Sequence, residues 1–165
     1  MGLWDTIKGW FNIGGVQVLL WKYSEPLSKA NPVIDGAALI KSKSGKRVLS
    51  LEIKFVEEYT HQVGEGDDKR SKTDTTVLGL LKFPDHDPGI GYPLDLKPGD
   101  QQEQLFTLHV ALTDRLQNAG GVLGGIGKVA GWMTSEKLEY YLIAEASVQG
   151  AAFNTWDKKK IDIVA

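Results

Sequence analysis

The sequence contains no cysteine, and this absence removes several kinds of chemistry together. Disulfides, thiolate metal sites, iron–sulfur clusters and cysteine nucleophiles all require thiols. An excess of charge of one sign is also lacking, because 19 basic residues balance 21 acidic ones and the formal net charge is -2. The chain therefore has no strong electrostatic field that would attract nucleic acid or an anionic membrane.

Long apolar runs are missing as well. No stretch reaches the roughly 18 residues that a membrane-spanning helix needs, and the start of the chain lacks the pattern of a secretory signal. We expect a cytoplasmic protein, with peripheral contact to a membrane left open. The 165 residues suit one domain, and 42% hydrophobic with 24% charged residues is an ordinary globular composition.

Alternation of apolar and polar residues is the dominant pattern, and it predicts half-buried strands. In residues 47–59 the apolar positions of this alternation are Leu49, Leu51, Ile53 and Phe55. Five further segments are expected to be strands: 16–20, 33–42, 106–112, 138–146 and 161–163. Residues 75–82 fit either a central strand or a turn of helix, and their paired threonines favour a strand.

Turn residues separate these segments. Ser44-Gly45-Lys46 is expected to close a hairpin between Val33–Ser42 and Arg47–Tyr59. Residues 64–74 contain no apolar residue and are expected to form an exposed loop. Short strands with frequent turns and no alternating helices predict an all-β protein, an antiparallel sandwich that forms a single domain over residues 15–165.

Residues 1–14 carry helical periodicity instead, and Gly14 and Gly15 end the pattern. At about 100° per residue, one side of this amphipathic helix is apolar. The residues on that stripe are Leu3, Trp4, Ile7, Trp10 and Phe11. A helix of this length is marginal alone in water. The stripe must therefore be covered, either by the chain's own sandwich, by a membrane interface or by a partner protein.

A second helical pattern covers residues 118–133, which are rich in glycine. Its apolar face includes Val122, Leu123 and Ile126. Each interior glycine costs about 1 kcal/mol relative to alanine, so this insert is expected to be helical only where that face is buried. It is either a crossover that docks on the sheet or a conditional element that binds a membrane or a partner.

Motifs for catalysis and cofactor binding match weakly. Gly125–Ala130 fits G-x-G-x-x-A without the strand that should precede it. Asp85-His86-Asp87 offers metal-ligand types, but neighbours in an extended segment point in different directions. Glu57 and Glu58 break the apolar alternation, and as neighbours on a strand they face opposite sides. We expect no enzymatic activity, no cofactor and no metal; an enzyme whose site joins distant residues is the remaining alternative.

The succession of strands resembles the arrestin-like family. The resemblance is carried by Val16-Gln-Val-Leu-Leu20, a spacer ending at residues 33–40, residues 48–58 and 98–110, and the closing segment 138–164. Within the family the chain is most similar to the bacterial sporulation-control proteins, which often begin with a short helix. The resemblance implies an arrestin-like antiparallel sandwich that acts as a non-enzymatic adaptor or scaffold for another protein. The chain is about one sandwich long, whereas the longer family members carry two.

A sandwich of this kind can bind a partner through exposed edge strands, through its end loops and through aromatic anchors. The residues expected to contact a partner or a membrane are Leu3, Trp4, Ile7, Trp10, Phe11, Val122, Leu123 and Ile126.

Overall fold

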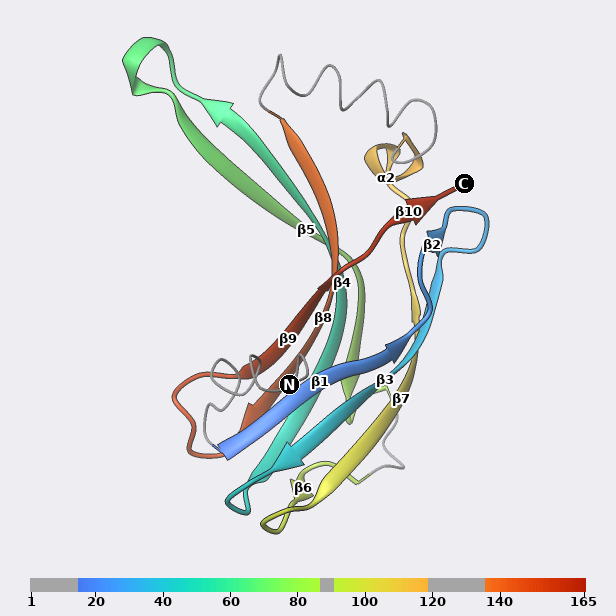
Figure 1. Ribbon diagram of the computed structural model, residues 1–165, viewed down its shortest axis with the longest axis vertical. Helices are drawn as coiled ribbons and strands as arrows, with labels where there is room; N and C mark the ends of the chain where they lie inside the picture. The colour runs from blue at the N-terminus through green and yellow to red at the C-terminus, as the bar shows by residue number, and fades with distance from the viewer. Residues whose placement is uncertain (1–14, 87–90, 119–135) are drawn as a thin grey trace, which may run out of the picture.

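The computed structural model describes residues 15–86, 91–118 and 136–165, which form two facing sheets (Figure 1). The small sheet has the order β1-β3-β7 and consists of β1 (Val16–Tyr23), β3 (Val33–Ser42) and β7 (Gln101–His109). The large sheet has the order β5-β4-β8-β9, with β6 paired to β4; its strands are β4 (Arg47–Val63), β5 (Arg70–Phe83), β6 (Leu94–Asp95), β8 (Lys137–Val148) and β9 (Thr155–Lys160). Both sheets are antiparallel, so the predicted all-β sandwich is confirmed.

Helical structure is scarce in the described residues. Helix α2 spans Asp114–Asn118, and a 3-10 turn spans Gly66–Asp68. A short parallel pair joins β2 (Leu27–Ser28) to β10 (Ile163–Val164). The predicted helix over residues 1–14 lies outside the described residues, as does the predicted insert over 118–133 apart from Asn118, the last residue of α2.

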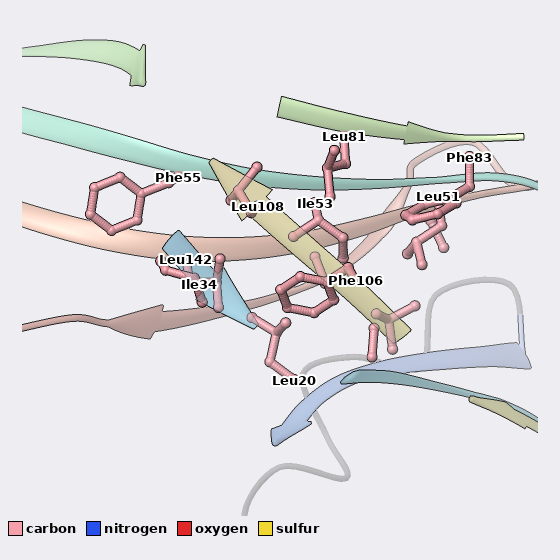
Figure 2. Packing of buried hydrophobic residues seen from close by; sticks show 14 of the residues in the cluster. Leu20, Ile34, Leu51, Ile53, Phe55, Leu81, Phe83, Phe106, Leu108 and Leu142 are labelled. Atoms are coloured by element: carbon pink, nitrogen blue, oxygen red, sulfur yellow. The ribbon is translucent and has the colours of Figure 1, made fainter. Parts of the chain in front are cut away.

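The core lies between the two sheets and uses the inward positions of alternating strands (Figure 2). Ile34, Phe106 and Leu108 of the small sheet face Phe55 and the other inward residues of the large sheet. Each fully buried large aliphatic or aromatic side chain stabilises the fold by about 1.5–3 kcal/mol. The alternation that predicted residues 47–59 and 138–146 as strands is therefore the pattern of this core.

One position of that alternation is wrong, because β4 contains a bulge opposite β8. The register shifts between Val48 and Ser50. Val48 consequently enters the core with no exposed surface, while Leu49 is 41% exposed. An extra residue in one strand turns the side chains on either side of it, and a period-two pattern cannot locate it.

The predicted hairpin between Val33–Ser42 and Arg47–Tyr59 is also wrong. β3 lies between β1 and β7 and so has a neighbour along both edges, whereas β4 belongs to the other sheet. Ser44–Lys46 therefore connects the two sheets across the end of the sandwich. The two strands bury their apolar faces against each other through the core instead of pairing side by side.

The expected loop over residues 64–74 is shorter than predicted. Arg70–Asp74 belongs to β5 and pairs with the end of β4, so only residues 64–69 form the turn. The segment is exposed, as predicted, apart from a partly buried Asp74. Residues 75–82 are part of the same strand, as the threonines indicated, but β5 is an edge strand rather than a central one.

Two seams join the sheets along the body of the sandwich. On one side the buried carboxylate of Asp157 in β9 accepts the backbone N–H of Leu20 in β1, with Oδ2 2.8 Å from the nitrogen. On the other side Ala111, just after β7, donates its backbone N–H to the carbonyl of Leu78 in β5 at 2.7 Å. These contacts occupy parts of the edges that a simple sandwich would leave open.

Candidate functional site

A long hairpin projects from the sandwich beyond the seam at Leu78 (Figure 1). It consists of residues 57–63 of β4 and 70–76 of β5, here called the arm. Side chains of its two strands bond across the pair: Thr60 to Thr73 at 2.7 Å and Gln62 to Ser71 at 3.0 Å. Such cross-strand pairs hold a hairpin that has little core beneath it.

The inner face of the arm continues the inward side of the core. Phe55 and Glu57 lie two residues apart on β4, and their partners on β8 are Leu142 and Tyr140. The rings of Phe55 and Tyr140 stack with their centroids 5.8 Å apart. The alternation of β4 therefore carries Glu57 and then Tyr59 onto the face that is buried lower down.

Glu57 is a buried carboxylate with two donors. It is 3% exposed, its Oε1 accepts from Arg115 Nη1 at 3.1 Å, and its Oε2 accepts from the hydroxyl of Tyr140 at 3.0 Å. A buried charge requires such partners, since the desolvation of an unpaired carboxylate is costly. Burial, followed by the bond to Glu57, raises the pKa of Tyr140 well above its usual range, so that the hydroxyl keeps the proton it donates.

Arg115 extends this cluster onto the arm. The Cζ atom of Arg115 lies 4.3 Å from the ring centroid of Tyr59, and this ring stacks on His61 with centroids 4.9 Å apart. His61 Nε2 lies 2.8 Å from Oδ2 of Asp74, and Lys72 lies 3.1 Å from Oδ1. We call Glu57, Arg115, Tyr59, His61 and Asp74 the polar ladder.

Two ionisable groups of the arm, Asp74 and Tyr59, have shifted pKa values. Hydrogen bonds from His61 and then Lys72 lower the pKa of Asp74. The hydrogen bond between Tyr59 and Glu136, together with burial, raises the pKa of Tyr59. Near neutral pH the ladder therefore combines a charged carboxylate, a neutral phenol and a guanidinium in fixed positions.

The polar ladder holds a tyrosine and an arginine in contact at the inner face of the arm. Tyrosine and arginine are over-represented among residues that dominate binding energy, and here each is held by its neighbours. Leu138 lies directly opposite Tyr59 in the sheet and is 37% exposed. Tyr59 and His61 of the arm and Leu138 of β8 thus form an ordered surface beside Arg115.

The outer edge of the arm is open in the described part of the chain. β5 ends the strand order of its sheet, and no described strand pairs with the edge of residues 70–76 that faces away from β4. Arg70 and Lys72 lie on this segment, and charged side chains are a common guard against uncontrolled pairing at a sheet edge.

The outer face of the large sheet is charged and internally paired. Lys54 bonds Glu145 at 3.0 Å, Lys160 bonds Glu139 at 2.9 Å, and Lys158 bonds Glu58. Although partial burial of Glu139 favours its protonated form, bonds from Lys160, Tyr141 and Lys137 lower its pKa to about 2. Pairs of this kind contribute little individually and resemble an ordinary solvated face.

The opposite end of the sandwich carries a shallow, open depression. Its lining residues are Ser44, Gly45, Lys46, Arg47, Asp95, Leu96, Lys97, Pro98 and Gln149. Arg47 is already paired with Asp95 at 3.0 Å. Across residues 15–86, 91–118 and 136–165, no three side chains of histidine, cysteine, aspartate or glutamate are grouped to hold a metal ion. Asp85 and His86 are exposed, and Asp87 lies outside these ranges.

The eight residues predicted to contact a partner or a membrane lie outside the described residues: Leu3, Trp4, Ile7, Trp10, Phe11, Val122, Leu123 and Ile126. Their role stays a prediction. No helix in the described segments is long and apolar enough to span a bilayer.

The sequence interpretation missed the polar ladder. Glu57 was expected to break the alternation, and this is wrong, because the residue keeps the inward parity of Leu51, Ile53 and Phe55. The prediction that Glu57 and Glu58 face opposite sides agrees with their partners, since Glu57 bonds Arg115 and Glu58 bonds Lys158. The same parity, carried two and four residues beyond Glu57, would have placed Tyr59 and His61 on the inner face.

Comparisons with known proteins place the fold. No protein-family model and no curated protein matches the sequence. Among solved structures, the chain is similar to the crystal structure of Spo0M, a sporulation control protein from Bacillus subtilis, at 15% identity and a TM-score of 0.50. The match covers 91% of this chain and 49% of that one, so this chain spans about half the length of Spo0M. The chain therefore has the arrestin-like fold of Spo0M, as the succession of its strands predicted.

Proposed function

We propose that this chain is a non-enzymatic docking domain, an adaptor or scaffold that binds an extended segment of another protein at the arm. The observation that carries the proposal is the outer edge of residues 70–76, which no described strand occupies. An extended peptide that aligns with such an edge forms backbone hydrogen bonds with it, and neighbouring side chains supply specificity.

The polar ladder supports this proposal, because it holds the arm in one conformation before a partner arrives. Fixing a surface in advance reduces the ordering cost of binding. Glu57 ties the base of the arm to α2 through Arg115, and His61 ties its two strands together through Asp74. A partner strand added to β5 would extend a sheet that is already ordered.

Short peptides selected from a random display library against the full chain are the probe for this function. Two variants, Thr75→Pro and Thr76→Pro, test strand addition because proline removes the backbone N–H. Neighbouring residues in a strand direct their N–H groups to opposite sides. One variant therefore loses a bond to β4, and the other loses an outward donor while the sheet stays intact.

Thermal unfolding identifies which variant keeps native stability. We expect that variant to lose binding of the selected peptides, and the peptides to protect backbone amides of residues 70–76 from hydrogen exchange in the native chain. Unchanged peptide binding by the stable variant would refute strand addition. Cosedimentation of the chain with phosphatidylserine vesicles, without any peptide binding, would favour a peripheral membrane role instead.

A further inference from the structure

The outer face of the small sheet carries apolar residues that the core does not use. Strand alternation directs Val18, Leu20 and Ala38 into the core, and so directs the residues between them outward. In the register of the sheet, Leu19 lies opposite Leu39, and Ala37 lies opposite Leu105. With Trp21 at the bulge of β1, these residues form what we call the outer patch: Leu19, Trp21, Ala37, Leu39 and Leu105.

Two residues of the outer patch are buried although they face away from the core. Leu19 is 4% exposed and Ala37 is 2% exposed, and neither belongs to the core cluster. Neighbours on one sheet face stand side by side and shield the flanks of a side chain but not its end. Leu105, on the same face, is 67% exposed, and Trp21 is 42% exposed. A further layer over Leu19 and Ala37 would account for this burial.

The chain before β1 begins beside this patch. Gly15 has a φ of 77°, and its carbonyl accepts the backbone N–H of Lys43 at 2.9 Å, which fixes the point where the preceding segment leaves the sheet. A glycine with positive φ permits a sharp reversal of the chain. Residues 1–14 can therefore turn back over the outer face.

The length of that segment matches the distance it must cover. Twelve helical residues rise about 18 Å. Leu19 and Trp21 lie three and five residues beyond Val16, or about 10 and 17 Å along an extended strand. A helix running back from Gly15 passes over both positions.

We propose that residues 2–13 form an amphipathic helix that folds back and docks its apolar stripe on the outer patch. The stripe consists of Leu3, Trp4, Ile7, Trp10 and Phe11. A tethered segment is present at an effective concentration of order millimolar, well above that of a free partner. The sandwich thereby gains a third layer, and its aromatic stripe is committed within the chain.

The absence of cysteine makes a thiol-labelling test direct, because a single introduced thiol is the only one present. Ala37→Cys places it on the buried part of the outer patch, and Leu80→Cys places it on a residue of β5 that is 54% exposed. Each variant is made with the native N-terminal segment and with Trp10→Ser plus Phe11→Ser. Circular dichroism confirms that all four proteins are folded.

Alkylation rates of the four proteins decide the proposal. We expect the Ala37→Cys thiol to react on the order of tenfold faster when the stripe is disrupted, because its reaction requires the covering layer to open. The Leu80→Cys thiol should react at one rate in both backgrounds. Equal rates for Ala37→Cys in both backgrounds would overturn the proposal. So would protection that grows with protein concentration, which assigns the patch to a second copy, or protection that requires phosphatidylserine vesicles.

Discussion

Replacing Asp157 by alanine is expected to weaken the seam between β1 and β9. The Asp157 side chain is 4% exposed, and its Oδ2 lies 2.8 Å from the backbone nitrogen of Leu20. In the Asp157→Ala protein, the N–H of Leu20 loses its carboxylate acceptor at a buried place. The substitution also removes the ion pair between Lys159 Nζ and Asp157 Oδ1, which lie 3.8 Å apart.

The size of the effect follows from that geometry. A hydrogen bond to a charged group contributes about 1.5–3 kcal/mol, and an unsatisfied buried donor adds to the loss when the acceptor is deleted. We therefore expect the free energy of unfolding to fall by about 2–3 kcal/mol. In a chain of this size each kcal/mol corresponds to about 2–4 °C, so Tm should fall by about 4–12 °C.

Thermal unfolding followed by circular dichroism measures this change, and hydrogen exchange locates it at the amide of Leu20. Asp157→Asn keeps an oxygen acceptor and should lose less than half as much stability. Asp162→Ala, at an exposed position close by in the sequence, is the control. The reasoning fails if Asp157→Ala and Asp162→Ala differ by less than about 0.5 kcal/mol, or if the Leu20 amide keeps its protection.

Three further changes test other parts of the structure. Gly36→Ala should cost about 1–3 kcal/mol in urea unfolding, because a Cβ there would lie 2.5 Å from Cζ of Phe106. Tyr140→Phe should cost about 1–2 kcal/mol in the same assay, because a buried oxygen of Glu57 loses its donor. Folding lowers the pKa of Glu139 from 4.5 to about 2, so its contribution is complete above pH 4.5 and is lost as the pH falls toward 2. Glu139→Gln should therefore flatten the fall in Tm over that acid range.

Each of these changes has a contradicting result. Tyr141→Phe is the control for Tyr140→Phe, since Tyr141 also donates to a carboxylate but at a partly exposed position. Equal losses of stability from the two changes would show that the buried hydrogen bond contributes no more than the partly exposed one. Glu103→Gln changes an exposed acid and should keep the native acid profile. A Glu139→Gln protein that keeps that profile as well would contradict the role given to Glu139. A Gly36→Ala protein as stable as the native one would contradict the crowding of this position by Phe106 and by the backbone oxygen of Lys22.

Much of the sandwich could be predicted from alternation alone, because a half-buried strand must alternate. Leu51, Ile53 and Phe55 are fully buried as that pattern requires. The pairing of strands could not be predicted in the same way. A short turn such as Ser44–Lys46 connects two strands equally well within one sheet or between two, and the choice depends on which edges distant strands already occupy.

The arm and its ladder escaped prediction for a different reason. Arg70–Asp74 has no apolar residue and both of its faces are exposed to water, so hydrophobic alternation could not reveal it as a strand. Arg115 reaches Glu57 from a residue 58 positions away, and a contact at that separation depends on the folded topology. The aromatic stripe of residues 1–14 stays a prediction, which the labelling test above addresses.

β4 has a mechanical consequence, because its 17 residues run without interruption from the core into the arm. Its register with β5 shifts between Phe55 and Val56, where the projecting hairpin begins. The arm is therefore a lever whose fulcrum is packed in the sandwich, with no hinge to isolate one from the other. A load applied at its tip would be transmitted to Phe55 and Leu142. Binding of a partner at the arm should therefore change the exchange rates of the slowest-exchanging backbone amides of the interior.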